Sequence, residues 1–459
     1  MQWTKHQFSL IAIVAITSFM GTFLISSVNI ALPSIEKSLH LDAITLSWVI
    51  TSFLLSTAIF LLPIGRIGDN TGVARVFKLG IIIFTLASAA CSMAPSGMWL
   101  IVFRFIQGIG TAFTSTTGPA ILVAAFSAKQ RGKVLGIAVS AVYLGLAIGP
   151  FAGGFLTQFA GWRSIFYVST LLGIITAIVT LIFLKRDKIS NAQNKEFDFR
   201  GAIFYMLGLT AMVYGSSLIP NTLGWALMAA GALFIIGFWM HENKTHSPIL
   251  DTQLFTRNRL FRYSNLAALI NYSATFAIIF LLSLYLQKVK ALTPREAGTI
   301  LIAQPIMMAI FSPIAGKLSD KIQPRYIATL GMAMCTVGLA FFTFINTETP
   351  MWSIVAILLW VGLGFAFFSS PNMNTIMSSV EKSQYGLASG TAATMRVVGQ
   401  ITSMTIATLF FASIIGKVTI DNVATETFIF AVKWSFAVFT VISIAGIYFS
   451  YDRGKIIRE

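Results

Sequence analysis

The chain has 459 residues, of which 56% are hydrophobic and 10% charged, and its mean hydropathy is +0.80. Soluble globular proteins carry about 25% charged residues, so this chain has too few polar groups to cover a surface in water. The composition excludes an ordinary soluble enzyme, a disordered regulator and a secreted disulfide scaffold. The net charge of +16 lies in short basic tracts between apolar runs, a pattern that favours a membrane over nucleic acid.

Fourteen apolar runs are long enough to cross a bilayer, which takes about 20 residues in a helix. The predicted spans are 8–31, 44–64, 77–94, 98–125, 134–157, 164–184, 200–219, 223–240, 264–287, 296–315, 326–345, 352–371, 384–413 and 430–450. The first run is interpreted as a retained helix, because it is too long for a signal peptide and no small-residue cleavage site follows.

Basic residues in the loops predict the orientation. With a cytoplasmic N-terminus, the inner segments hold 23 Lys and Arg and the outer loops hold 7. We therefore expect both termini in the cytoplasm and the protein in the plasma (inner) membrane.

The turns after the second and tenth spans resemble one another. Gly65 and Asp69 recur as Gly316 and Asp320, with basic residues following in both turns. This internal repeat predicts two related six-helix halves with two helices inserted between them, an arrangement typical of transporters. The expected division is a half at 1–186, a linker with the inserted helices at 187–262, and a half at 263–459.

Several short motifs belong to these spans. They are Gly65-x-x-x-Asp69-x-x-Gly72 with Arg75, Arg104-x-x-Gln107-Gly108, Gly145-x-x-x-Gly149-Pro150-x-x-Gly153-Gly154, and Asn29-Ile-Ala-Leu-Pro33. With them the chain resembles the major facilitator superfamily, and within it the fourteen-helix drug:proton antiporters. The resemblance covers essentially the whole chain and implies an all-α membrane fold of two six-helix halves plus two inserted helices.

The glycines of the fifth span recur at i and i+4, which clears one helix face for close packing. Pro150 removes a helical hydrogen bond there. Tight packing alone explains this pattern. The resemblance adds that the same helix pair seals a gate as the halves move, and the two interpretations are compatible.

The turn carboxylate Asp69 is either simply solvated or, as the resemblance implies, part of a latch with Arg75 or with a helix N-terminus of the other half. Asp320 is its expected counterpart. Asn70 stands where the family usually has arginine, so part of the charge relay is missing.

Two arginines fall inside predicted spans. Arg104, with Gln107 one turn later, either reaches toward the outer surface or, by resemblance, joins the proton path or a polar network between the first and fourth helices. Arg396, with Gln400, is the comparable feature of the second half, and it matches no strong motif.

The main departure from the family is at Leu24, where an aspartate usually precedes Asn29 by five residues. We find no acidic residue or histidine well inside any predicted span, and Glu36 flanks the outer end of the first. Proton antiport normally needs such a group. Asn29, Glu36 and the two arginine–glutamine pairs are therefore the candidate proton and substrate network.

We hypothesise proton-driven efflux of hydrophobic drug-like compounds by alternating access. The alternative is export of an anionic or amphipathic metabolite or lipid bound by Arg104 and Arg396. A membrane enzyme or receptor is disfavoured, since no nucleophile motif, phosphate loop or zinc cluster occurs. The expected partners are a small-molecule substrate, protons and membrane lipid, with no nucleic acid, metal or cofactor, and the expected state is a monomer.

Overall fold

The computed structural model describes residues 3–184, 197–245, 248–250, 252–381 and 384–454. All the regular structure in these ranges is helical, and the predicted all-α membrane fold is confirmed. Thirteen spans are long and apolar enough to cross a membrane among the residues described. The predicted seventh span is present as a helix but falls outside these thirteen.

The N-terminal half consists of six long helices. They are α1 (Lys5–Leu39), α2 (Ala43–Thr71), α3 (Val73–Ser92), α4 (Gly97–Ala125), α5 (Ala128–Ala160) and α6 (Arg163–Phe183). The most extensive contacts within this half join α1 to α5, and α4 to α2 and α3. Gly72 ends α2 and begins α3 with a φ of 103°, a left-handed backbone that glycine adopts without strain.

The C-terminal half follows a short connecting helix, α9 (Thr252–Arg257). Its helices are α10 (Arg259–Thr275), α11 (Ala277–Lys288), α12 (Pro294–Leu301), α13 (Ala303–Lys321), α14 (Pro324–Phe342), α15 (Met351–Ser378), α16 (Tyr385–Phe410) and α17 (Thr425–Tyr451). α10 with α11, and α12 with α13, form continuous spans, and a π turn at Phe411–Ile415 extends α16. A 3-10 turn, Ile420–Asn422, lies between α16 and α17.

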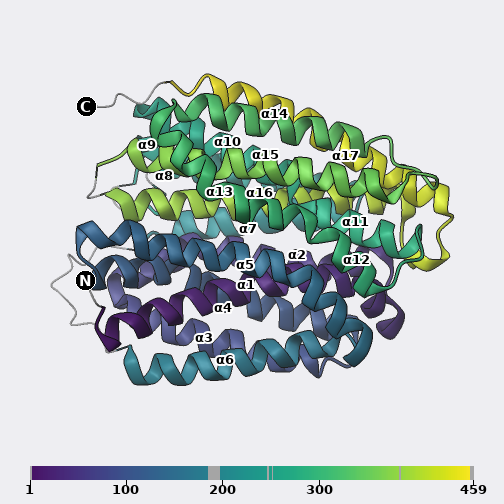
Figure 1. Ribbon diagram of the computed structural model, residues 1–459, viewed down its shortest axis with the longest axis horizontal. Coiled ribbons are helices and arrows are strands. Elements are labelled where there is room, and N and C mark those ends of the chain that lie inside the picture. Colours follow the sequence, from purple (N-terminus) through teal and green to yellow (C-terminus); the bar gives the residue numbers. More distant parts are fainter. Residues whose placement is uncertain (1–2, 185–196, 246–247, 251, 382–383, 455–459) are drawn as a thin grey trace.

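The two halves lie side by side, and α1 begins at the same end of the bundle at which α17 finishes (Figure 1). We call the opposite end, which carries the α11–α12 connection and the start of α17, the distal end. The sequence predicts that this end faces outward.

The inserted hairpin consists of α7 (Phe199–Ser217) and α8 (Thr222–Glu242). α7 packs against α8 and contacts α2 of one half and α16 of the other. The Tyr205 hydroxyl donates a hydrogen bond to the Ala58 carbonyl at 3.0 Å, which fixes α7 on the N-terminal half.

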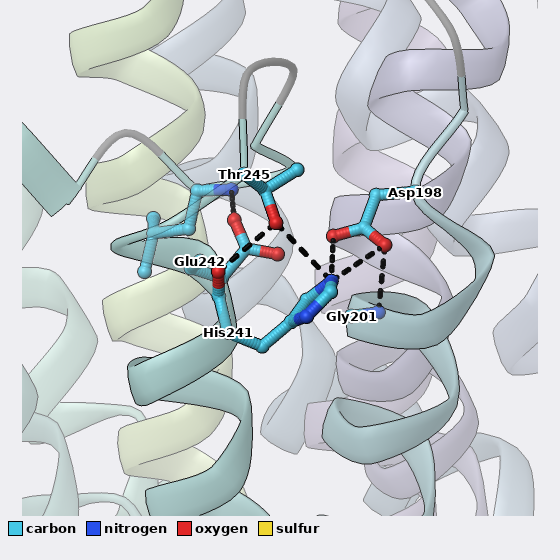
Figure 2. Close-up of polar contacts among 6 residues, drawn as sticks. Asp198, Gly201, His241, Glu242 and Thr245 are labelled. Carbon is cyan, nitrogen blue, oxygen red and sulfur yellow. Dashed lines mark hydrogen bonds and ion pairs between the residues drawn. The ribbon is translucent and has the colours of Figure 1, made fainter.

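Polar contacts join the start of α7 to the end of α8 (Figure 2). Asp198 accepts a hydrogen bond from the Gly201 amide and lies 2.9 Å from His241 Nε2. Glu242 accepts the Leu250 amide at 2.9 Å. Burial acts to raise the pKa of Asp198, but the contacts with Gly201 and His241 lower it by more, so the net shift is downward.

The first helix is longer than the sequence predicts. α1 continues through Pro33 to Leu39, so Glu36 lies in its last turn instead of beyond its end. This carboxylate is 3% exposed. The sequence interpretation, in which Glu36 only flanks the helix, is thereby corrected.

Candidate functional site

A ladder of hydroxyl groups joins α1 to α5. The side chains of Thr22, Ser26 and Ser27 donate hydrogen bonds to carbonyls of α5, at 3.0, 3.3 and 2.9 Å respectively. One acceptor is the Leu146 carbonyl, four residues before Pro150. Since proline has no N–H to donate to that carbonyl, the Ser26 hydroxyl supplies the bond that the helix lacks.

The predicted glycines of α5 make this close approach possible. A Cβ atom on Gly149 would lie 2.5 Å from Ser26 Cβ, and one on Gly153 would lie 2.6 Å from Ser27 Cα. Gly145 faces Thr22 in the same way. These three glycines therefore form the face of α5 that packs on α1, as expected for small residues between membrane helices.

The remaining residues of the motif face the other half. A Cβ on Gly154 would meet the Pro294 carbonyl of α12, and one on Gly298 of α12 would meet the Pro150 carbonyl. The motif in α5 thus has two faces, one within its own half and one across the boundary between halves.

Several contacts close the boundary at the distal end. The Ser283 hydroxyl and the Gln287 amide of α11 donate to the Asn29 and Ile30 carbonyls, at 2.7 and 2.9 Å. The Thr408 hydroxyl donates to Ser47 at 3.0 Å. The structure is therefore a distal-closed state.

Near the middle of the bundle a polar and aromatic cluster spans both halves. The Tyr143 hydroxyl of α5 and the Ser369 hydroxyl of α15 are 2.9 Å apart. Tyr272 packs edge-on against Phe365 with ring centroids 5.4 Å apart, and Tyr143 and Arg396 lie within electrostatic range of its hydroxyl. We call these five residues the central cluster; the rings and the guanidinium suit a planar ligand.

The predicted pair Arg104 and Gln107 lies inside the N-terminal half, and neither side chain is exposed. Arg104 Nε donates to the Val49 carbonyl at 3.1 Å, Nη1 donates to Gln107 Oε1 at 2.6 Å, and the guanidinium lies 4.3 Å from the Phe53 ring centre. Gln107 in turn donates to Ser88 at 2.6 Å. Arg104 therefore ties α4 to α2 directly and to α3 through Gln107, and it does not reach the surface. Among the residues that the structure describes, its Nη2 has no hydrogen-bond partner.

Other predicted residues are placed apart from one another. Arg396 and Gln400 are half-buried on α16, and Arg396 belongs to the central cluster. Asn29 is buried, and its side-chain carbonyl has no hydrogen-bond partner in the part of the chain that the structure describes. Leu24, at the position of the usual aspartate, is fully buried among apolar side chains.

The predicted gating motif is only partly described. Gly65 and Gly72 lie at the end of α2, and Arg75 is exposed in the first turn of α3. The side chains of Asp69 and Asp320 lie outside the described residues. The latch stays a prediction.

Two residues that make buried or inter-half polar contacts could not be predicted from the sequence motifs. Ser369 is one of several small polar residues in its span, and only the fold brings it to Tyr143. Arg453 follows the last span, where a solvated basic residue is the ordinary expectation. It is instead 1% exposed and donates to Asn372 Oδ1 at 2.6 Å and to the Ser450 carbonyl at 2.7 Å. Burial lowers the pKa of Arg453 to about 9.

The apolar spans, the two packed halves and the distal contacts between them are those of a multi-pass membrane protein; the family match and the relatives given next identify a transporter and not an enzyme. The sequence model of the Major Facilitator Superfamily matches residues 11–404 and, in a second match, residues 266–455. The chain belongs to this superfamily.

Relatives with different substrates match over most of the chain. It is 32% identical over 409 residues to the riboflavin transporter RibZ of Clostridioides difficile, covering 89% of this chain and 88% of the relative. It is 30% identical over 382 residues to the multidrug resistance protein Stp of Mycobacterium tuberculosis, covering 81% and 70%. A methylenomycin A resistance protein of Bacillus subtilis is 26% identical over 407 residues, covering 87% and 86%.

Solved structures share the fold. A bacterial homolog of the human lysosomal transporter Spinster, inward-facing and unoccupied, superposes with a TM-score of 0.70 at 14% identity, over 98% of both chains. A D-xylose–proton symporter gives a TM-score of 0.67 at 12% identity, also over 98% of both chains.

Proposed function

We propose that this transporter exports hydrophobic, drug-like compounds by alternating access, driven by the proton gradient. It would act as a monomer in the plasma (inner) membrane, with both termini in the cytoplasm. The resistance proteins among its relatives support this direction and substrate class.

The observation that carries the proposal is the central cluster. It joins α5 of one half to α15 of the other through Tyr143 and Ser369, so any ligand bound there would separate the halves or replace that contact. Tyr272 and Phe365 offer aromatic surfaces beside it. Apolar and aromatic linings accept a range of ligands because packing, and few directed hydrogen bonds, supplies the affinity.

The second candidate is transport of a planar or anionic metabolite. Arg396 gives the central cluster a positive charge, and the relative named as a riboflavin transporter shares 32% identity over 89% of this chain. This candidate needs no buried acid to pair with a cationic drug, which suits Leu24 at the usual aspartate position.

The proton site is proposed among Asp69, Glu36 and the network of Arg104. Glu36 is favoured because its carboxylate lies between the two halves, where movement of the halves would change its surroundings.

The class of substrate separates the two candidates. Cells that express the wild type or Arg396→Gln would be tested for efflux of a cationic dye, a neutral drug and riboflavin. Efflux of the cationic and neutral compounds that survives the substitution supports drug export. Movement of riboflavin alone, lost in Arg396→Gln, supports the metabolite transporter. Movement of none of them in either protein contradicts both.

A further inference from the structure

Pro33 leaves a backbone carbonyl of α1 without its usual donor near the distal end. The helix continues through this proline to Leu39, but proline has no N–H to donate to the carbonyl of Asn29, four residues earlier. Asn29 is 2% exposed, so bulk water does not reach it. A buried carbonyl without a donor costs free energy comparable to a lost hydrogen bond. The closed structure therefore needs a donor from elsewhere.

The C-terminal half supplies this donor. The Ser283 hydroxyl of α11 donates to the Asn29 carbonyl at 2.7 Å, and Ser283 is fully buried. Gln287, one turn later, donates to the Ile30 carbonyl at 2.9 Å and to the Ser283 hydroxyl at 3.1 Å. The gap that Pro33 makes in the hydrogen bonds of α1 is thus filled by a side chain from across the boundary between the halves.

The comparable gap at Pro150 of α5 is filled from within one half. There the Ser26 hydroxyl of α1 donates to the Leu146 carbonyl, and both helices belong to the N-terminal half. Alternating access moves the halves largely as rigid bodies, so the bond from Ser26 persists through the cycle. The bond from Ser283 joins the two halves and breaks each time the distal end opens.

We propose that Ser283 is a gating residue, whose hydroxyl favours the distal-closed state by supplying the hydrogen bond that Pro33 removes from α1. Without this hydroxyl the Asn29 carbonyl is buried and unpaired in the closed state, whereas water reaches it in the open state. Loss of the hydroxyl therefore makes opening easier. The inference rests on the alternating access proposed above and assigns part of the balance between its two states to one side chain.

A cysteine elsewhere on the boundary would report on opening. Ser47 of α2 is fully buried and accepts a hydrogen bond from Thr408 of α16, on a different pair of helices from α1 and α11. Ser47→Cys introduces a thiol there, and the native Cys91 and Cys335 are both fully buried. Labelling by a membrane-impermeant maleimide, applied from the distal side, then measures how often the halves separate. No substrate is needed, so the result stands apart from any failure of the proposed export function.

Ser283→Ala in the Ser47→Cys background should speed labelling between about threefold and fifteenfold, which corresponds to the average and the largest contributions of hydrogen bonds between membrane helices. Ser273→Ala on α10 is the matched control. Ser273 is also buried, but its hydroxyl donates to the Leu269 carbonyl of its own helix, so labelling should be unchanged. Unaltered labelling in Ser283→Ala overturns the proposal, as does an equal increase in both variants.

Pro33→Ala tests the source of the effect. Alanine restores an N–H that donates to the Asn29 carbonyl within α1, so the bond from Ser283 is no longer required in the closed state. In the Pro33→Ala background, Ser283→Ala should therefore change the labelling rate by less than about twofold. An increase as large as the one seen with Pro33 in place would show that Ser283 acts through packing, and would contradict the proposal.

A second pair of variants gives a test that stands even if Pro33→Ala does not insert. Threonine and valine have nearly the same shape, and only threonine carries a hydroxyl. Ser283→Val should therefore be labelled faster than Ser283→Thr, by a factor in the same range. Equal rates, or a slower rate in Ser283→Val, would contradict the proposal.

Discussion

The packing of α5 on α1 gives the prediction with the clearest steric basis. In Gly149→Ala the new Cβ would lie 2.5 Å from Ser26 Cβ, whereas an ordinary contact begins at 3.4 Å. The two helices must therefore separate by about 1 Å, because the contact is between atoms close to both backbones and not with a flexible side-chain end.

Separation also weakens the hydroxyl ladder. The Ser26 bond to the Leu146 carbonyl is already 3.3 Å long, and the Ser27 bond to the Gly149 carbonyl is 2.9 Å. Overpacking costs about 1–3 kcal/mol, and each interhelical hydrogen bond in a membrane contributes about 0.6 kcal/mol. The expected loss is roughly 2–4 kcal/mol for Gly149→Ala, and more for Gly149→Leu, which should also abolish transport.

Gly136→Ala is the matched control. Gly136 lies on the same helix, but a Cβ there would meet no atom of the described residues within 4 Å. The change should be neutral or stabilising, because alanine favours a helix by up to about 1 kcal/mol over glycine. Thermal unfolding of the detergent-purified variants, together with transport in cells, measures both effects. A Gly149→Ala protein as stable and active as the wild type would refute the steric argument, as would equal losses in the two variants.

Further predictions concern other parts of the bundle. Arg104→Ala should lower transport and stability more than Arg104→Lys, since Ala removes the buried charge and leaves Gln107 Oε1 without its donor; equal full activity in both would show that the network is dispensable. Asp69→Asn should reduce transport while membrane insertion, followed by surface labelling, is unchanged; full transport would refute the latch. Tyr143→Phe should weaken ligand binding several-fold in an equilibrium assay if its hydroxyl contributes one hydrogen bond, and unchanged binding would remove Tyr143 from the site. Because the pKa of Asp198 is lowered in the folded protein, its stabilising effect is present above its unfolded pKa of about 3.9 and is lost as the pH falls through the lower folded value. The difference in melting temperature between wild type and Asp198→Asn should therefore persist from pH 8 to 5 and shrink below about pH 4. A difference that is already lost at pH 5 would contradict this assignment.

Hydropathy alone predicts most of the fold, because each span must satisfy its backbone hydrogen bonds within lipid. It fails at helix ends. The proline and glutamate after residue 31 predict a loop. In the structure α1 continues through Pro33 to Leu39, because contacts from the other half at the distal end cover its last turns. α7 is predicted as a span, and its lower hydropathy fits its place between α2 and α16, where protein and not lipid surrounds much of it.

The candidate site divides in a similar way. The glycines of α5 are predictable because their spacing repeats along one helix, and the structure adds that Gly154 faces α12. Arg104 and Gln107 are one turn apart and meet as expected. Tyr143 and Ser369 are 226 residues apart, and the bond between them depends on how the halves dock. The burial of Glu36 likewise depends on a loop nearly 400 residues further on.

Substrate-dependent proton movement tests the central claim most directly. The purified protein would be reconstituted in proteoliposomes with an internal pH dye, and cationic, neutral and anionic compounds, riboflavin included, would be added in turn. Proton-driven export predicts a proton flux that depends on a cationic or neutral compound and is absent in protein-free vesicles. Uptake of an anion or of riboflavin without any accompanying proton flux would contradict it.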